Sequence, residues 1–524
     1  MNIKAIAKIL GKIMVLEGIL MCAPLLVSIL YKEYELNIVT IWGLQVSKNL
    51  LAFALPIVVL VGIGLLLQLI KPKRNHLYQR EAFALCALVW IIMALFGCLP
   101  FMINGDIPYF FNAFFETMSG FTTTGASIVS NVTLMLHSSL FWRSFTHWIG
   151  GMGILVFILI FIPESDDGSA LHLLKAESPG PQVGKLASKM KATTTILYLI
   201  YLGLSVLGTI LLMLGPTNVV NGVEYKMNLF NALLTIFGAA GTGGFGFVAD
   251  SMEHFAPYTQ YVIATLLILF GTNFSLYFLI LVGKVKDVFK SEEFRTYLII
   301  LVLAVIMVMS NLLIRFDNIR SLSALTPDLL ELRFRQSYFQ VASIMTTTGY
   351  TTTNYQMWPA LAKVILILLM ICGAMAGSTG GGIKVSRLIM AVKGVRLKIK
   401  KIINPRYVES ATFEGKPLED EAISDVFAFL CIYFFIMFIV IVILSFDHFN
   451  MTMEVGHSPF LTNFTATVSC LSNIGPGLDG VGPYTNFNNY SALSKFILAI
   501  TMLIGRLEIY PVIILLSPRT YRRV

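Results

Sequence analysis

The sequence predicts an all-α integral membrane protein with about ten transmembrane helices and four shorter re-entrant helices. Three observations lead to this fold class. Of the 524 residues, 56% are hydrophobic and only 13% are charged, against about 25% charged in ordinary soluble domains. The apolar residues gather in runs of about 20, which is the length a helix needs to cross a bilayer core. Four polar turns, rich in glycine and hydroxyl residues, lie between these runs.

Ten apolar runs are long enough to span a membrane. They lie near residues 10–30, 41–70, 82–103, 140–162, 193–214, 258–283, 295–315, 360–376, 424–446 and 492–516. The first run follows three lysines, as the apolar part of a signal peptide does. It is long, however, and no small-residue cleavage site follows it, so we expect a retained helix.

The basic residues indicate how the chain is oriented in the bilayer. They concentrate in loops 71–80, 284–295 and 384–406, whereas loops 101–139 and 447–491 contain no Lys or Arg. Because basic loops favour the cytoplasmic side, both termini are expected in the cytoplasm and the four polar turns outside. The formal net charge of +9 therefore reflects topology, and the expected partner is the lipid bilayer, with no nucleic acid.

The four polar turns form an internal repeat. Their sequences are TTTGAS (122–127), GTGGFGF (241–247), TTTGYTTT (346–353) and SNIGPGL (472–478), here named turns 1 to 4. They align on Gly125, Gly244, Gly349 and Gly475, and two positions earlier stand Thr123, Thr242, Thr347 and Asn473. A pattern that recurs at intervals of 119, 105 and 126 residues indicates repeated structural units.

Residues 1–75 are predicted to form a helix pair outside the repeat. The remainder is predicted to divide into four units, 76–192, 193–293, 294–418 and 419–524. Each unit reads as helix, short apolar segment, polar turn, helix. The short segments, 109–121, 228–240, 335–345 and 459–470, cannot span a bilayer, so we expect re-entrant helices. Near their starts, the polar residues Asn112, Asn231, Gln336 and Thr462 are expected to cap them.

The composition of the turns suits a desolvated monovalent cation. Rings of backbone carbonyls can replace its water, glycine permits the backbone conformations that such rings need, and hydroxyl groups can brace the turn. Each short helix also directs its partly negative C-terminus at the turn. The turns contain no Asp or Glu, which disfavours a divalent cation, and nearby Glu116 is expected to pack behind turn 1.

The second helix of each unit carries an interruption 25 to 30 residues after the turn glycine. These are HWIGGMG from 147, GTNFS from 271, the run 373–382 and GRLE from 505. Small or polar residues at membrane depth face packed protein or a water-filled cavity. Four at matching positions favour one central cavity. His147 is expected to be a satisfied core residue, with a proton carrier as the alternative.

The interruption at 373–382 is a candidate gate. Glycine in a helix costs about 1 kcal/mol relative to alanine, so this cluster is expected to unwind; the alternative is a close helix crossing. Arg506 is the second candidate, because an ionised side chain at mid-membrane costs at least about 2.5 to 3.5 kcal/mol. It is expected near the gate cluster, with burial among other carbonyls as the alternative. The candidate gate residues are Gly377, Ser378, Thr379, Gly380, Gly381, Gly382, Lys384 and Arg506.

Several motifs together resemble the Trk/Ktr/HKT superfamily of potassium transport proteins, and within it the TrkH/TrkG type. They are FETMSGFTTTGAS with HWIGGMGI, TGGF, MTTTGYTTTNYQMWP with GAMAGSTGGGIK, and SNIGPGLDGVGPY with IGRLEIYP. The resemblance covers nearly the whole chain. It implies four pseudosymmetric helix–pore loop–helix units around one pore, and a glycine loop beneath the filter that acts as the gate.

The resemblance also implies the ion-binding residues. The filter would consist of Thr122, Thr123, Thr124, Gly125, Gly241, Thr242, Gly243, Gly244, Thr346, Thr347, Thr348, Gly349, Ser472, Asn473, Ile474 and Gly475. Potassium would bind at Thr123, Thr124, Thr242, Gly243, Thr347, Thr348, Asn473 and Ile474. Glycine in all four turns resembles the potassium-selective pattern, whereas some sodium-passing relatives carry serine in the first. Turn 2 departs from the pattern, since GFGF lacks the hydroxyl residue that many relatives have after the phenylalanine.

The implied function is potassium uptake across the bacterial inner membrane, with potassium as the transported ion and no organic cofactor. The implied partners are a second copy in a homodimer and a cytosolic nucleotide-binding regulator similar to TrkA. Two other functions are alternatives. A secondary transporter of a larger solute would show inverted halves with paired broken helices, whereas these four units share one orientation. A membrane hydrolase would need a nucleophile or metal motif, and neither HExxH nor GxSxG occurs.

Overall fold

The computed structural model describes residues 1–41, 44–72, 77–153, 190–318, 325–408, 410–447 and 458–521. Helices dominate these ranges, and the strands within them pair as three separate antiparallel hairpins. The apolar runs of the sequence have thus folded as helices, as the predicted fold class requires.

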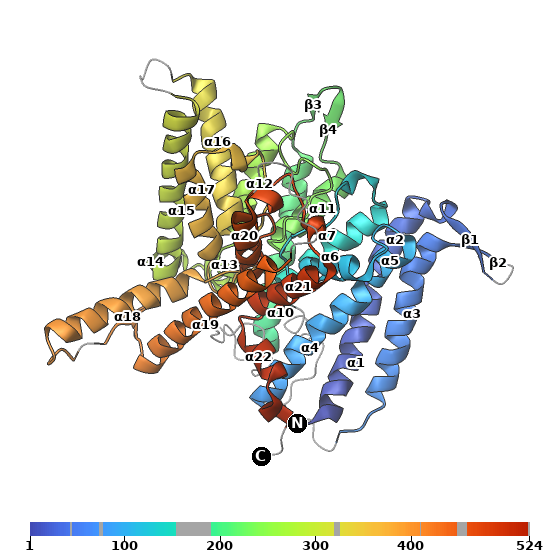
Figure 1. Cartoon of the computed structure of the whole chain (residues 1–524), viewed down its shortest axis with the longest axis horizontal. Helices are drawn as coiled ribbons and strands as arrows, with labels where there is room; N and C mark the ends of the chain where they lie inside the picture. The colour runs from blue at the N-terminus through green and yellow to red at the C-terminus, as the bar shows by residue number, and fades with distance from the viewer. Residues whose placement is uncertain are drawn as a thin grey trace.

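The N-terminal region is a helix pair joined by a small hairpin. It consists of α1 Ile3–Leu20, α2 Cys22–Leu30, the 3-10 turn η1 Glu33–Glu35, β1 Ile38–Ile41, β2 Leu44–Ser47 and α3 Lys48–Gln68. Asn2 caps α1 by accepting a hydrogen bond from the backbone of Ala5. In Figure 1 the pair stands at one edge of the molecule, beside α4 and apart from the central helices.

The rest of the chain repeats one pattern four times: a long helix, a short helix, an extended turn and a second helix. The first helices are α4 Gln79–Gly97, α10 Met190–Met213, α15 Glu292–Asn311 and α19 Asp420–Ser445. The short helices are α6 Phe110–Phe121, α11 Leu229–Ala240, α16 Pro327–Met345 and α20 Pro459–Ser472. The second helices are α7 His137–Gly151, α12 Pro257–Phe270, α17 Ala360–Ile371 and α21 Ala492–Arg506.

Shorter elements connect these helices. In the first two repeats they are α5 Leu99–Asn104, η2 Val132–Leu134, β3 Asn218–Val220, β4 Val223–Tyr225, α13 Phe274–Leu281 and α14 Val285–Lys290. In the third they are the π-helical turn η3 Leu312–Phe316, η5 Tyr355–Met357, α18 Val385–Ile403, β5 Thr412–Phe413 and β6 Lys416–Pro417. In the fourth they are η6 Asp479–Val481, η7 Phe487–Asn489, α22 Tyr510–Leu516 and η8 Pro518–Tyr521.

Among the described residues, helical segments long and apolar enough to cross a membrane form at six of the ten predicted spans. They are Ile3–Leu30, Lys48–Gln68, Gln79–Asn104, Ala192–Met213, Glu292–Phe316 and Asp420–Ser445. A seventh, at 258–283, is the pair α12 and α13, which is bent by 92°. The remaining three runs hold shorter helices, and the predicted run 140–162 extends beyond residue 153 into residues outside the described ranges.

The four broken runs break where the sequence carries its interruptions. Helix α7 ends at Gly151, α12 at Phe270, α17 at Ile371 and α21 at Arg506. After α21 the chain turns through Glu508 and Ile509, whose φ angles are 53° and 75°. The glycine-rich run 373–382 is not helical, so the expectation that it unwinds is confirmed.

The short helices match the predicted segments to within two residues, except that α16 begins earlier. Helix α16 begins at Pro327, eight residues before the predicted start, because Thr326 accepts a hydrogen bond from the backbone of Leu329 and Pro327 fixes the first turn. The predicted caps were wrong: the N-cap residues are Tyr109, Asn228, Thr326 and Ser458. The residues predicted as caps lie inside the helices instead.

The two ends of the described chain lie on the same side of the molecule. In Figure 1, α1 begins and α22 ends at the lower edge, whereas the β3–β4 hairpin projects at the opposite edge. The short helices lie at the centre of the molecule. In α6, every residue from Ala113 to Phe121 is buried. This arrangement brings the four turns to the middle of the fold.

Candidate cation filter and gate

The four turns adopt the same backbone conformation. The residue two positions before the aligned glycine is left-handed in each, with φ of 54° at Thr123, 54° at Thr242, 58° at Thr347 and 56° at Asn473. The glycines follow with φ of 79°, 75°, 86° and 104° at Gly125, Gly244, Gly349 and Gly475. A left-handed residue with a Cβ costs about 1 to 2 kcal/mol and is uncommon for a branched side chain. Four such residues in register indicate one repeated local structure.

A shared hydrogen bond holds each left-handed residue in place. The next backbone N–H reaches back five residues into the last turn of the short helix, as in a Schellman motif. The bonds run from Thr124 to Ser119 at 2.9 Å, Gly243 to Gly238 at 2.8 Å, Thr348 to Ser343 at 2.8 Å and Ile474 to Ser469 at 2.9 Å. Each short helix therefore ends directly at its turn, and its partly negative C-terminus lies beside it.

The four turns close into a ring. A Cβ added to Gly125 would overlap the carbonyl oxygen of Gly243, one at Gly244 that of Thr348, and one at Gly349 that of Ile474. A Cβ at Gly475 would lie 2.8 Å from the carbonyl oxygen of Thr124. Each turn thus packs its glycine against a carbonyl of the next turn, and the fourth returns to the first. The close approach explains why glycine occupies all four positions.

Hydroxyl and amide side chains brace the ring from behind. In turn 1 the Thr122 hydroxyl donates to the Met118 carbonyl at 2.7 Å and lies 2.8 Å from the Thr124 hydroxyl. Thr346 and Thr348 of turn 3 repeat this pair at 2.8 Å. Turn 4 uses an amide, because Asn473 Nδ2 donates to Thr124 Oγ1 of the adjacent turn 1 at 2.9 Å.

The residue after each glycine differs among the four turns: Ala126, Phe245, Tyr350 and Pro476. Tyr350 donates its hydroxyl to the carbonyl of Thr235 at 3.0 Å and to that of Phe245 at 3.3 Å. It thereby joins turn 3 to turn 2. The four turns therefore share their backbone conformation at the aligned positions but differ in the side chain that follows the glycine.

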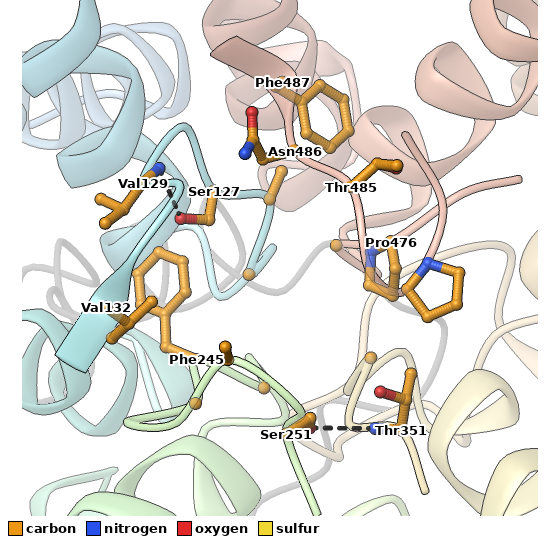
Figure 2. A pocket seen from close by; sticks show the side chains of 18 of the residues that line it. Ser127, Val129, Val132, Phe245, Ser251, Thr351, Pro476, Thr485, Asn486 and Phe487 are labelled. Atoms are coloured by element: carbon orange, nitrogen blue, oxygen red, sulfur yellow. Dashed lines mark hydrogen bonds between the residues drawn. The ribbon is translucent and has the colours of Figure 1, made fainter. Parts of the chain in front are cut away.

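A cavity of about 120 Å³ opens over the ring, and all four aligned glycines line it. Figure 2 shows side chains from the four repeats around this space, among them Ser127, Phe245, Thr351 and Pro476. Among the described residues that line it, none carries a carboxylate. The lining consists of backbone, hydroxyl, amide and apolar groups together with the guanidinium of Arg143. It offers no ring of carboxylates such as a divalent cation would need.

Glu116 lies behind turn 1, as the sequence led us to expect. Its carboxylate accepts hydrogen bonds from the Ser127 hydroxyl and the Ile128 backbone N–H, both at 2.9 Å. It also pairs with Arg143, whose Nε lies 2.6 Å from Glu116 Oε1. Sequence reasoning missed Arg143, although the argument that singled out Arg506, an arginine within an apolar run, applies to it equally.

His147 is a packing residue beside turn 2. Its ring is buried and its Nδ1 lies 2.7 Å from the Gly120 carbonyl oxygen. A Cβ on Gly243 would overlap the same ring. His147 thus supports the turn from behind, which agrees with the interpretation as a core residue.

The gate candidate 373–382, here named the gate loop, is closed at its base. The Gly373 N–H donates to the Ile383 carbonyl at 2.8 Å, and the Ile383 N–H donates to the Ile371 carbonyl at 3.1 Å. One carboxylate oxygen of Glu293, in α15, accepts from the N–H of Ala376 at 2.8 Å and of Ser386 at 3.0 Å. Glu293 therefore holds the loop at Ala376 and also holds the start of α18 at Ser386.

The C-terminal part of the gate loop packs against turns 3 and 4. The Gly381 N–H donates to Thr347 Oγ1 at 2.6 Å. A Cβ on Gly381 would overlap the carbonyl oxygen of Ser472, and one on Gly380 would lie 3.0 Å from that of Thr346. These are the first residues of the turns, whereas the cavity is lined by the later ones. The loop and the cavity thus lie at opposite ends of the ring.

Two cationic side chains contact the gate loop, Lys384, which is buried, and Arg506, which is half-buried. Lys384 donates to the Gly380 carbonyl. Arg506 donates to the Thr379 carbonyl at 2.8 Å and to the carbonyls of Gly150 and Gly151 at 2.5 and 2.7 Å. Arg506 therefore bridges the gate loop and the interruption that ends α7.

Glu508 forms an ion pair with an arginine other than Arg506. It pairs with Arg387 of α18, and the Arg387 guanidinium carbon lies 4.1 Å from the Phe429 ring centroid. All eight candidate gate residues lie in the gate loop or contact it. Of the filter candidates, the first residues of turns 3 and 4 lie directly beside them.

Thr347→Val is expected to loosen the gate loop and leave the ring closed. Valine keeps the branched shape at this left-handed position but leaves the buried Gly381 N–H without its acceptor, at a cost of about 1 to 3 kcal/mol. Hydrogen exchange at Gly381 should accelerate, and the midpoint of thermal unfolding should fall. Thr347→Ser is the control, because it keeps the hydroxyl. Equal protection of Gly381 in the two variants would contradict the assignment of this bond.

Comparison with known proteins agrees with this geometry. Residues 50–520 match the family model described as TrkH, cation transport protein. The chain is 30% identical to the Trk system potassium uptake protein TrkH of Escherichia coli K12 over 530 residues, and 28% identical to TrkG of the same strain over 522. These alignments cover 100% and 98% of both partners, respectively.

The fold is also similar to a solved structure. The crystal structure of the potassium transporter TrkH from Vibrio parahaemolyticus superposes with a TM-score of 0.81 at 27% identity, covering 100% of both chains. These matches confirm the resemblance stated from the motifs and the prediction of a transport protein rather than an enzyme. The chain belongs to the TrkH family of cation transport proteins.

Proposed function

We propose that the protein takes up potassium across the bacterial inner membrane through the ring of four turns. The observation that carries this proposal is the closed ring, in which each glycine packs against a carbonyl of the next turn. Four carbonyls held at one level offer the oxygen ligands that a potassium ion needs in exchange for water. The names of the relatives, which are potassium uptake proteins, support the same ion.

The proposed path begins at the outer cavity and ends at the gate loop. Potassium loses water at the turns, where the oxygens of Thr123, Thr124, Thr242, Gly243, Thr347, Thr348, Asn473 and Ile474 would hold it. The gate loop, bonded to Thr347 and Arg506, would block the way until it moves. Arg506 would also limit how many cations dwell there, because its charge repels them.

The proposal extends to organisation and partners. The helix pair 1–75 would support four pore units, 76–192, 193–293, 294–418 and 419–524, with both termini in the cytoplasm. A homodimer and a cytosolic nucleotide-binding regulator similar to TrkA are proposed as partners. The regulator would act from the basic side, where Glu414 in the loop before α19 accepts hydrogen bonds from Ser291 and the Glu293 backbone at the start of α15.

Flux measurements on the purified protein in liposomes test the function. Imposed gradients of potassium, sodium and protons should give rapid potassium movement and slower sodium movement. Dependence of the potassium flux on a proton or sodium gradient at fixed voltage would reveal coupling. Equal potassium and sodium fluxes would reject the filter, and exchange of a larger solute without ion flux would favour an alternating-access transporter.

A further inference from the structure

An arginine and a glutamate form a deeply buried ion pair beside the proposed filter. Arg143 lies in α7 and Glu116 in α6, and their side chains are 3% and 0% exposed. A buried pair is costly to desolvate unless further hydrogen bonds satisfy both groups. The remaining bonds of this pair therefore indicate what it holds.

The pair spans the junction between turns 1 and 2. Glu116 accepts from Ser127 and Ile128 at the outer end of turn 1. Arg143 donates from Nη1 to the carbonyl of Gly246, in turn 2, at 2.9 Å. Its guanidinium carbon lies 3.5 Å from the centroid of the Phe245 ring, in cation–π contact. One ion pair thus fixes the outer ends of two turns.

The other three junctions are held by neutral groups. Tyr350 joins turn 3 to turn 2, the Tyr355 hydroxyl reaches the Gly477 carbonyl of turn 4 at 2.9 Å, and the Phe487 N–H reaches the Ser127 carbonyl of turn 1 at 2.9 Å. The positions equivalent to Glu116, nine residues before the aligned glycines, hold Thr235, Gln340 and Ala466. The charged junction therefore belongs to turns 1 and 2.

The arginine also supports turn 2 at a residue that has no side chain. Gly246, which follows Phe245, cannot brace the turn with a side chain of its own. In this chain the Gly246 carbonyl is held from outside, by Arg143. Arg143 also lines the outer cavity, where Glu116 neutralises a charge that would otherwise repel entering cations.

We propose that the Glu116–Arg143 pair positions turns 1 and 2 and so determines how strongly the filter prefers potassium over sodium. This inference rests on the proposed function. Both residues are positioning residues, since they act on the filter carbonyls through Ser127, Ile128 and Gly246. Loss of the arginine frees the outer end of turn 2, and a wider, softer ring accepts the smaller sodium ion with less discrimination.

The test compares potassium, rubidium and sodium fluxes in liposomes for wild type, Arg143→Gln, Arg143→Lys, Glu116→Gln and the double variant Glu116→Gln/Arg143→Gln. Arg143→Gln and the double variant should lower the potassium-to-sodium flux ratio by roughly tenfold, the effect of one lost charge-assisted hydrogen bond. Glu116→Gln leaves an unbalanced cation at the mouth, so it should also raise the potassium concentration for half-maximal flux, most clearly at low ionic strength.

A matched control is Arg333→Gln, which breaks another largely buried arginine–carboxylate pair. Arg333 lies 2.6 Å from Asp317, outside the turns, so its loss should reduce stability and leave the ion preference unchanged. The double variant removes both charges and leaves neither buried alone, so it is the variant expected to fold. If the double variant folds poorly, the flux ratio of Arg143→Lys tests the inference instead. A lysine keeps the positive charge but cannot contact Glu116 and the Gly246 carbonyl at once, as the guanidinium does.

A wild-type flux ratio in a folded double variant, or in Arg143→Lys when that variant decides, would overturn the inference. An equal loss of preference in Arg333→Gln would overturn it as well, because the effect would then reflect stability. A wild-type protein without potassium preference would instead reject the proposed function. The two failures are therefore distinguishable in one set of measurements.

Discussion

Gly125→Ala is expected to reduce potassium flux by roughly 30-fold or more. A Cβ at this position would overlap the Gly243 carbonyl, and alanine disfavours the φ of 79°. Overpacking costs about 1 to 3 kcal/mol and a left-handed alanine about 1 to 2 kcal/mol, so the strain of about 2 to 5 kcal/mol corresponds to roughly 30- to 5000-fold in an equilibrium or rate. Flux of potassium and sodium into liposomes measures the effect, and the preference for potassium should fall with the rate.

The control for this substitution is Gly203→Ala. A Cβ at Gly203, within α10, would meet nothing within 4 Å, and alanine favours the helix by about 1 kcal/mol. This variant should transport potassium like the wild type. If Gly125→Ala also kept wild-type flux and ion preference, the ring of turns would not be the path of the ion.

Arg506→Ala is expected to raise potassium flux through the purified protein by roughly ten- to a hundredfold, since each hydrogen bond to a charged group contributes about 1.5 to 3 kcal/mol. The substitution removes the bonds that tie the Thr379 carbonyl of the gate loop to the ends of α7 at Gly150 and Gly151. It also removes a positive charge from the proposed path. Both changes favour an open loop, and single-channel or liposome flux recordings measure the result.

Arg506→Lys separates the two causes. Lysine keeps the charge, but its compact ammonium group cannot reproduce the fork that reaches carbonyls on both sides. A flux like that of Arg506→Ala would show that the hydrogen bonds close the gate, and a flux like the wild type would show that the charge does. Unchanged flux in both variants would contradict a role for Arg506 in gating.

The repeated architecture was predictable because it depends on short local patterns. The aligned glycines, the hydroxyl residues before them and the breaks in the second helices were all visible in the sequence. Each reflects a strong local requirement: a positive φ at Gly125, or a helix that cannot continue through the glycines of 373–382. Such requirements act over a few residues and leave a clear sequence signal.

The residues that tie the turns together were harder to predict because their partners are distant in sequence. Arg143 bonds Gly246 and Glu116, and Glu293 bonds Ala376 and Ser386. No spacing rule links such positions. The predicted helix caps were wrong for a related reason. They were chosen at equivalent positions of the repeat, whereas α16, for example, begins where Thr326 of its own preceding loop supplies an oxygen.

The four different residues after the aligned glycines have a consequence for how such a protein can change. In an assembly of four identical chains, one altered codon would change all four sides of the passage. Here Ala126, Phe245, Tyr350 and Pro476 are encoded separately, so one mutation alters a single side and leaves three intact. Ion preference can therefore be adjusted in small steps during evolution, one side of the passage at a time.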